Sequence, residues 1–362
     1  MLLDIVLLFI SFLVIIAGAE LFTNGVEWLG VRLRLSEGAV GSVLAAVGTA
    51  LPETTIPFVA LVFFKEKESQ EIGLGAILGA PFMLATLAFF VTALSAWVYR
   101  RRRENGWRLR VNRHIVTRDL GFFLPLYAFA IAASFLPDPH RGRFLVAVVL
   151  IVVYAYYVYL NLRESAEGEK EEPLMLHVVW SWLPLIRPVP NREEHLARRE
   201  AINGAEPRLQ AVAFQVLLAL ALILAGAYKF VGATQDICIL IGFSPLLFAL
   251  IVAPIATELP EKLNSVIWVR QGKDTLALGN ITGAMVFQAT FPVTVGILLT
   301  PWHFRALSTG NAALLSAGIA LASGLLVLVR VRLGRSQTMA PWPLALGLIG
   351  WLLFVGYVFV TR

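Results

Sequence analysis

Apolar runs long enough to cross a lipid bilayer recur along the whole chain, and they restrict its fold more than any other feature. A helix needs about 20 predominantly apolar residues to span the hydrocarbon core. Only 15% of the 362 residues are charged, whereas about a quarter of a soluble domain is charged. We therefore predict an all-α membrane protein with about ten transmembrane helices, at residues 2–20, 38–64, 72–99, 119–136, 143–162, 209–228, 241–269, 275–300, 311–331 and 342–361.

Basic residues are distributed unevenly over the loops between these runs. If the N-terminus is outside the cell, the inward-facing loops carry 22 Lys and Arg residues and the outward-facing segments carry 7. Loops rich in Lys and Arg stay on the cytoplasmic side. We expect both termini outside, the central loop in the cytoplasm, and a prokaryotic plasma or inner membrane as the location. The net charge of +6 does not indicate nucleic acid, because the basic residues lie in short loops.

One motif occurs twice, in the second and in the seventh apolar run. Residues 48–53 are Gly-Thr-Ala-Leu-Pro-Glu, and residues 256–261 are Ala-Thr-Glu-Leu-Pro-Glu, 208 positions later. The same offset pairs Gly18 with Gly226. The chain therefore contains an internal repeat.

The repeat extends into the following run and predicts how the chain is organised. Residues 74–80 match residues 278–284 at an offset of 204. Five runs precede the second copy, so the two halves should cross the membrane in opposite directions, as in many transporters. We predict two inverted five-helix repeats, at residues 1–162 and 209–362, with a cytoplasmic linker loop at 163–208.

The repeated motif places oxygen ligands inside the membrane. Proline removes a backbone donor and disturbs the preceding turn, which exposes carbonyl oxygens near Gly48 and Thr49. Calcium takes six to eight oxygens from carboxylates, carbonyls and water. In inverted repeats such sites lie near the bilayer midplane. We predict a cation site there, formed by Glu53 and Glu261 with Thr49, Thr257 and Glu258.

Carboxylates in a membrane span are costly unless they bind a partner. Glu53, Glu258 and Glu261 together would cost about 8–10 kcal/mol if they were unpaired. One alternative is that they pair with Lys262 and only hold helices together. Glu258 precedes Lys262 by four residues, which favours an ion pair. If the two residues do not pair, Glu258 is an additional ligand or a proton carrier, since burial disfavours the charged carboxylate.

The sequence does not favour other kinds of site. All five histidines fall in loops or at the edges of the apolar runs, and no Ser, His and Asp set is assembled within them. The single cysteine, Cys238, excludes an intrachain disulfide. We expect a transporter and not an enzyme, with no cofactor beyond the transported ions. Its expected partners are inorganic cations and the lipid bilayer.

The two motifs resemble the alpha repeats of the cation/Ca2+ exchanger superfamily. That family typically shows Gly-Thr-Ser-x-Pro-Glu in one helix and Gly-Asn-x-x-Gly-Ser-Asn in the next. The match covers residues 15–95 and 226–300. The resemblance implies ten helices in two inverted halves and alternating-access exchange of Ca2+, or a similar divalent cation, for Na+. It implies Ca2+ binding by Glu53 and Glu261, with oxygens from Thr49 and Thr257.

Further residues of the motifs either follow or depart from the family pattern. Possible contacts of the coupling ion or of the ligands are Gly48, Asn280, Gln288 and Lys262. The serine that follows the threonine is replaced by Ala50 and Glu258, and the serine of Gly-Ser-Asn by Ala80 and Ala284. In sodium-coupled relatives several of these oxygens belong to Na+ sites. Coupling to H+ is therefore an alternative within the family, and a non-transporting structural or regulatory relative is a further one.

Overall fold

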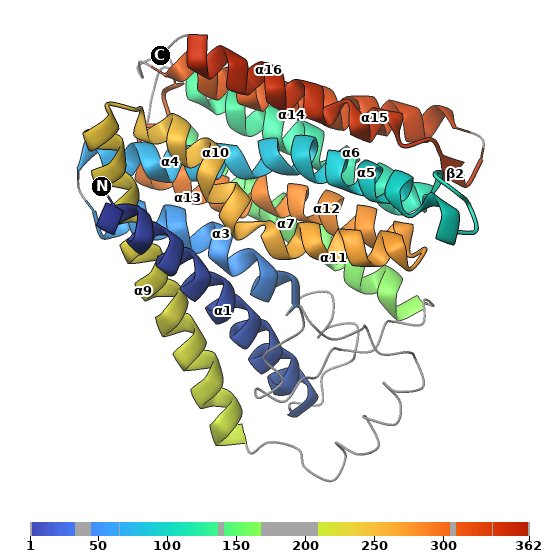
Figure 1. Ribbon diagram of the computed structural model, residues 1–362, viewed down its shortest axis with the longest axis horizontal. Helices are drawn as coiled ribbons and strands as arrows, with labels where there is room; N and C mark the ends of the chain where they lie inside the picture. The colour runs from blue at the N-terminus through green and yellow to red at the C-terminus, as the bar shows by residue number, and fades with distance from the viewer. Residues whose placement is uncertain are drawn as a thin grey trace.

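The computed structural model describes residues 2–32, 45–64, 66–136, 141–167, 209–304, 309–334 and 336–360. In this part of the chain eight helices are long and apolar enough to cross a membrane, and two shorter apolar helices, Glu53–Val62 and Pro245–Ile255, accompany them. The all-α prediction of about ten spans is therefore confirmed (Figure 1). In the described residues, β structure is limited to two short paired strands, β1 (Leu109–Arg110) and β2 (Thr338–Met339).

The helices follow one another in two series, one in each half of the chain. The first series is α1 (Leu2–Arg32), α3 (Ala45–Val62), α4 (Lys67–Met83), the π-helix η2 (Leu84–Ala88), α5 (Phe89–Val98), the short η3 (Arg100–Arg102), α6 (Arg113–Ala132), the short η4 (Ala133–Phe135) and α7 (Arg141–Glu167). The second is α9 (Leu209–Ile241), α10 (Pro245–Thr257), α11 (Leu259–Arg270), α12 (Asp274–Gln288), α13 (Phe291–Leu299), α14 (Gly310–Leu333), α15 (Trp342–Ala345) and α16 (Gly347–Val360).

Several predicted boundaries were too short. Helix α1 continues past residue 20 to Arg32, and α9 continues past residue 228 to Ile241. Both extensions include polar side chains, at which a hydropathy criterion stops, but a helix continues because its backbone groups need partners inside the bilayer. Helix α6 begins at Arg113, six residues before the predicted start. Residues 168–208 of the predicted linker lie outside the described residues.

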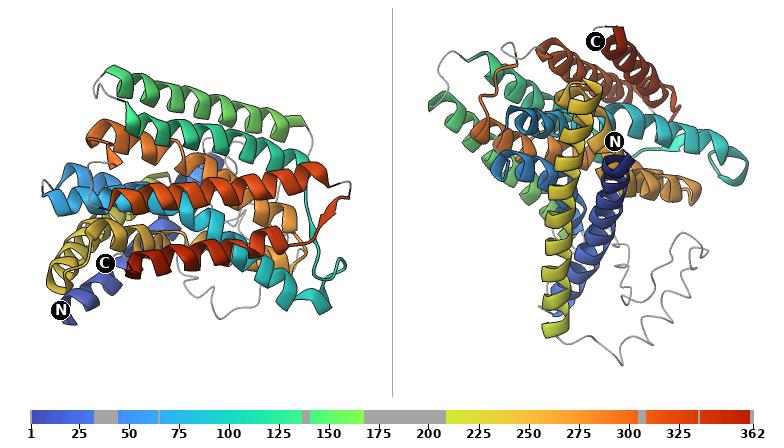
Figure 2. Two further views of the ribbon diagram at one scale, coloured as in Figure 1. Left: turned by 90° about the horizontal axis from the view of Figure 1, so that it is seen from above. Right: turned by 60° about the vertical axis from the view of Figure 1, so that its left-hand side comes forward.

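Helices α1 and α9 lie side by side and make the same contact twice (Figures 1 and 2). A Cβ added to Gly18 would lie 2.8 Å from Cγ1 of Ile223, and a Cβ added to Gly226 would lie 2.8 Å from Cγ1 of Ile15. Ile223 follows Ile15 by 208 residues, which is the repeat offset. The contacting residues increase in number along α1, from Ile15 to Gly18, while their partners decrease in number along α9, from Gly226 to Ile223. The two helices are therefore antiparallel. The two halves are inverted repeats, as predicted.

The third and eighth spans are interrupted at equivalent positions. The π-helix η2 (Leu84–Ala88) separates α4 from α5, and residues 289–290 separate α12 from α13. The offset of 204 places residues 84–88 opposite 288–292. π-helical turns and other irregularities inside helices are frequent at functional sites. The repeat therefore reproduces an irregular backbone as well as a sequence motif.

Helix α4 is buried along most of its length and packs closely on α10. A Cβ on Gly75 would collide with the carbonyl oxygen of Leu246, and a Cβ on Gly79 with that of Leu250. Small residues four apart allow two helix backbones to approach in this way. This glycine pair therefore lies at a close contact between the two helices. The contact connects the first half of the chain to the second.

Three of the loops predicted to be cytoplasmic, all within the described residues, lie together at one end of the bundle. Asp274, at the start of α12, accepts hydrogen bonds from the Arg103 side chain (2.6 Å) and the Arg110 backbone N–H (2.7 Å). Arg113 donates to backbone carbonyls at the end of α14. The paired strands β1 and β2 lie at the same end, on the right in Figure 1. These loops share one side of the molecule; the assignment of that side to the cytoplasm stays a prediction.

The reciprocal glycine contact gives a test of the symmetry. Replacement of Gly18 or of Gly226 by Leu should destabilise the protein by a similar amount, about 1–3 kcal/mol, because each side chain overfills the same closely packed contact. Thermal unfolding in detergent measures the loss. Gly232→Leu, also in α9, is the control, since a Cβ there meets no atom within 4 Å. An effect at only one of the two equivalent glycines would contradict the symmetric packing.

Candidate functional site

The seventh span is interrupted inside the repeated motif. Helix α10 ends at Thr257 and α11 begins at Leu259, while Glu258 between them has φ −91° and ψ 8°. A proline at position 260 supplies no backbone donor, which explains the break. The first copy behaves differently, because α3 runs without interruption from Ala45 to Val62. The turn that proline was predicted to disturb near Gly48 and Thr49 stays helical, since a proline can be accommodated within a membrane helix, and the interruption is found in the second copy.

Three carboxylates of the motif come together in the protein interior. Glu53 and Glu261 are each 5% exposed, and Glu258 is 1% exposed. Glu53 interacts electrostatically with Glu261 and Glu258, and also with Lys262. One oxygen of each carboxylate is buried and has no hydrogen-bond partner among the described residues. Two segments separated by about half the chain thus place their acidic side chains in one site.

Glu53 and Glu261 also share their local geometry. Each carboxylate interacts with the backbone N–H of its own residue. Their exposed fractions are equal, and they occupy equivalent positions of the repeat. The two side chains therefore occupy equivalent positions in the two repeats and are equally buried.

Lys262 forms the ion pair that the four-residue spacing predicts. Its Nζ lies 3.1 Å from Oε2 of Glu258 and 3.3 Å from the carbonyl oxygen of Pro254. The ammonium group therefore bridges the break between α10 and α11 and neutralises one carboxylate. Glu53 and Glu261 remain as two formal negative charges in a buried site.

The other predicted site residues differ in how far the structure describes them. The hydroxyl of Thr257 donates to the carbonyl of Ala253 at 3.2 Å, which leaves its oxygen lone pairs available. In α12, Oε1 of Gln288 and Nδ2 of Asn280 are buried without a partner among the described residues. The side chains at positions 48 and 49 lie outside the described ones.

A cation in this site would need more oxygens than the carboxylates provide. Within the described residues, no three His, Cys, Asp or Glu side chains are arranged to hold one metal ion. A cation between Glu53 and Glu261 would therefore take its remaining ligands from hydroxyl, amide, carbonyl or water oxygens, which suit Ca2+. The unpartnered oxygen of Gln288 and the hydroxyl of Thr257 are of this type.

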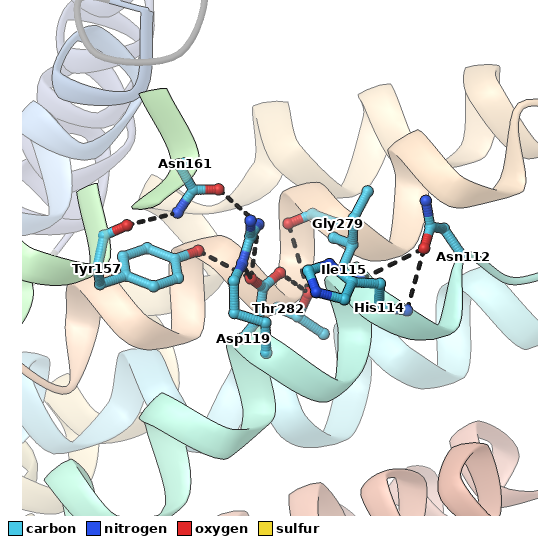
Figure 3. A network of polar contacts seen from close by, with 9 residues as sticks. Asn112, His114, Ile115, Asp119, Tyr157, Asn161, Gly279 and Thr282 are labelled. Atoms are coloured by element: carbon cyan, nitrogen blue, oxygen red, sulfur yellow. Dashed lines mark hydrogen bonds and ion pairs between the residues drawn. The ribbon is translucent and has the colours of Figure 1, made fainter. Parts of the chain in front are cut away.

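A second buried polar cluster was not predicted from the sequence (Figure 3). Asp119 of α6 is 1% exposed and accepts hydrogen bonds from Thr282 of α12 (2.7 Å) and from Tyr157 of α7 (3.0 Å). Arg118 lies 3.3 Å from the same carboxylate and 2.5 Å from Oδ1 of Asn161. Because Asp119 coincided with a predicted span edge, its burial was missed. The available signal was Thr282, a hydroxyl between the two glycines of the repeated Gly-x-x-x-Gly.

This cluster holds α12 in place. Thr282 lies on the same helix as Asn280 and Gln288, and Asp119 ties that helix to α6 and α7. A buried carboxylate with three donors is a strong constraint on the helices that supply them. We therefore assign the cluster a positioning role for α12.

The sequence profile described as sodium/calcium exchanger protein matches residues 3–163 and 211–361. The chain belongs to this family. It is 24% identical over 365 residues to the putative antiporter CaxA of Alkalimonas amylolytica, with 99% of each chain covered. It is also 23% identical over 303 residues to the inner membrane protein YrbG of Escherichia coli (strain K12), with 83% of this chain and 81% of the relative covered. Family membership makes it a multi-pass membrane transporter of inorganic cations.

Solved structures of exchangers have the same fold. A crystal structure of the H+/Ca2+ exchanger CAX matches with a TM-score of 0.68 at 16% identity, over 99% of this chain and 86% of the other. The sodium-calcium exchanger NCX_Mj matches with a TM-score of 0.56 at 17% identity, over 98% of each chain. Both kinds of exchanger thus share the arrangement of helices seen in this sodium/calcium exchanger family member.

The bridging lysine leads to a prediction about stability. Lys262→Ala should destabilise the protein by about 3–5 kcal/mol, since it leaves the Glu258 carboxylate buried without its cation. The double variant Glu258→Gln/Lys262→Ala should be more stable than Lys262→Ala, because neither charge remains. Thermal unfolding in detergent measures both, with Lys229→Ala, at an exposed position of α9, as control. Strictly additive effects would show that the two side chains do not interact.

Proposed function

We propose that this family member exchanges Ca2+, or a similar divalent cation, for Na+ by alternating access, with Glu53 and Glu261 as carboxylate ligands. The observation that supports the proposal is the pairing of these two residues. They occupy equivalent positions of inverted repeats, are equally buried, interact electrostatically and each carry an oxygen without a partner among the described residues. Two bare charges in a membrane interior are costly, so a cation between them would offset that cost.

The formal charge of the cluster supports a divalent ion. Three carboxylates and one lysine, Lys262, leave two negative charges. One divalent cation neutralises them, and two monovalent cations do the same. A site that must be neutral in the bilayer can therefore alternate between one divalent cation and two monovalent cations. This electrostatic requirement supports the proposed exchange of a divalent ion for monovalent ions.

Further residues of the motif would complete and tune the coordination. We assign Thr49 and Thr257 as oxygen donors to the cation, beside the two glutamates. Gly48, Asn280 and Gln288 would contact the coupling ion or the ligands. Glu258, paired with Lys262, would set the charge of the site and become a further ligand when that pair opens.

The division of the chain supports movement of one half against the other. We propose residues 1–162 and 209–362 as the two inverted repeats and residues 163–208 as a cytoplasmic linker, in a plasma or inner membrane with both termini outside. The antiparallel contact of α1 with α9, at Gly18 and Gly226, joins the two halves. Interrupted spans beside the site supply places at which each half can bend.

Coupling to H+ is a second candidate, and specific observations favour it. Ala50, Ala80 and Ala284 occupy motif positions where a hydroxyl could serve Na+, and alanine has no side-chain oxygen. The site instead holds a third carboxylate, Glu258, with one buried oxygen that has no partner among the described residues. Glu53 and Glu261 could accept two protons in place of one divalent ion. The three carboxylates could carry protons without the hydroxyl oxygens that Na+ sites would use.

Charge removal at the two glutamates tests the site. Glu53→Gln and Glu261→Gln should each weaken Ca2+ binding by at least about a hundredfold, because each removes one of the two uncompensated charges that attract the ion. Equilibrium binding of Ca2+ to the purified protein measures the change. Glu104→Gln, at an exposed position in a loop, is the control. Unchanged Ca2+ affinity in both site variants would end the proposal.

Flux measurements in proteoliposomes separate the candidate counter-ions. Ca2+ uptake should follow an imposed Na+ gradient at constant pH if Na+ is exchanged, and an imposed pH gradient without Na+ if H+ is exchanged. Absence of Ca2+ flux under both gradients, with retained Ca2+ binding, would indicate a non-transporting relative. The glutamine variants should be inactive under either gradient.

A further inference from the structure

A cavity of about 1150 Å³ lies between α6, α7 and the end of α14, and Arg118 of the Asp119 cluster is among its lining residues. Cavities that hold drug-sized ligands have volumes of about 300–1,000 Å³, so the space is ample for a larger ligand. Its long wall is one face of α6, from Arg113 to Phe129. That face is about 24 Å long, at 1.5 Å per residue.

The two ends of the cavity differ in chemistry. Four basic side chains gather at the start of α6 and the end of α14, namely Arg113, His114, Arg118 and Arg332. Arg113 donates to two backbone carbonyls of α14, which do not neutralise its charge. Arg118 is paired with the buried carboxylate of Asp119, at 3.3 Å. The positive charge of the basic end therefore comes from Arg113 and Arg332.

Beyond this end the walls are apolar. Phe122, Leu126 and Phe129 of α6 face Val149 and Val153 of α7. A Cβ added to Gly121, where the basic and apolar parts meet, would find no atom within 4 Å. The apolar stretch from position 121 to 129 is about 12 Å long, close to the roughly 15 Å depth of one hydrocarbon leaflet. The cavity thus combines a cationic end with an apolar part about as long as an acyl chain in one leaflet.

We propose that this cavity binds an anionic glycerophospholipid, with its phosphate at the basic end and an acyl chain along the apolar wall. Charge complementarity selects an anionic headgroup, because Arg113 and Arg332 would repel the choline of a zwitterionic lipid. The apolar wall selects a lipid over a free phosphate, which has no chain to place there. The basic end lies at the loop side predicted to be cytoplasmic, where clustered Lys and Arg attract anionic lipids.

Binding by the full-length protein in detergent tests the proposal with three probes. Phosphatidylglycerol should raise the thermal unfolding midpoint in a saturable manner, and native mass spectrometry should detect one retained molecule. Phosphatidylcholine with the same chains lacks the net negative charge, and glycerol 3-phosphate lacks the chains, so neither should have this effect. An equal effect of phosphatidylcholine or of glycerol 3-phosphate overturns the proposal. An equal effect of glycerol 3-phosphate assigns the basic end to a free phosphate.

Two variants locate the effect in the cavity. Gly121→Leu should abolish the phosphatidylglycerol response, because its side chain would fill the junction of the two parts. Gly318→Leu in α14 is the matched control, since a Cβ there also meets no atom within 4 Å. Arg332→Gln should weaken binding about fivefold, as expected for one basic side chain near an anionic lipid. Arg330→Gln, on the same helix end but outside the cavity wall, should not.

Arg332 is exposed, so Arg332→Gln should fold, and the test remains decisive even if Gly121→Leu does not fold. Full phosphatidylglycerol affinity in Arg332→Gln, or in a folded Gly121→Leu variant, overturns the proposal. A Gly121→Leu protein that changes its oligomeric state but keeps the lipid response assigns the cavity to a second copy of the chain. That result also overturns the proposal.

Discussion

A charged side chain finds no partner in the hydrocarbon of a bilayer, and the centre of this protein is arranged around that constraint. Glu53 and Glu261 are buried, close enough to repel each other, and without a full set of hydrogen-bond partners among the described residues. Such a pair is tolerable only when positive charge joins it. The surrounding helices are held by close contacts of small residues and by buried polar ties, which keep the carboxylates together despite their repulsion.

The symmetry of the fold explains why two acidic residues meet at all. Each half of the chain supplies one glutamate at the same place in its motif, and the antiparallel contact of α1 with α9 relates the halves. Inversion places both motifs at the same depth in the membrane, because the two halves of the chain enter the membrane from opposite sides. The inverted topology thus brings the two copies of the repeated motif together in a single candidate site.

The site also departs from symmetry in one respect. Glu258 stands where the first half has Ala50, and Lys262 compensates the added charge through an ion pair at 3.1 Å. The same lysine bridges the break between α10 and α11, whereas α3 is continuous at the equivalent motif. The second half therefore has the interrupted helix and the ion pair at its motif, and the first half has the continuous helix.

The sequence alone determined the membrane class, the inverted repeat, the family and the Glu258–Lys262 pair, because hydropathy, the repeat offset and i,i+4 spacing are local or periodic properties. It did not determine where α1, α6 and α9 begin or end, since a helix can continue through polar residues at which a hydropathy criterion stops. The burial of Asp119 was also decided only by tertiary structure. Besides the neighbouring Arg118, its partners are Tyr157 on α7 and Thr282 on α12, which are distant in the sequence, and only the packing of those helices shows that the carboxylate lies away from water.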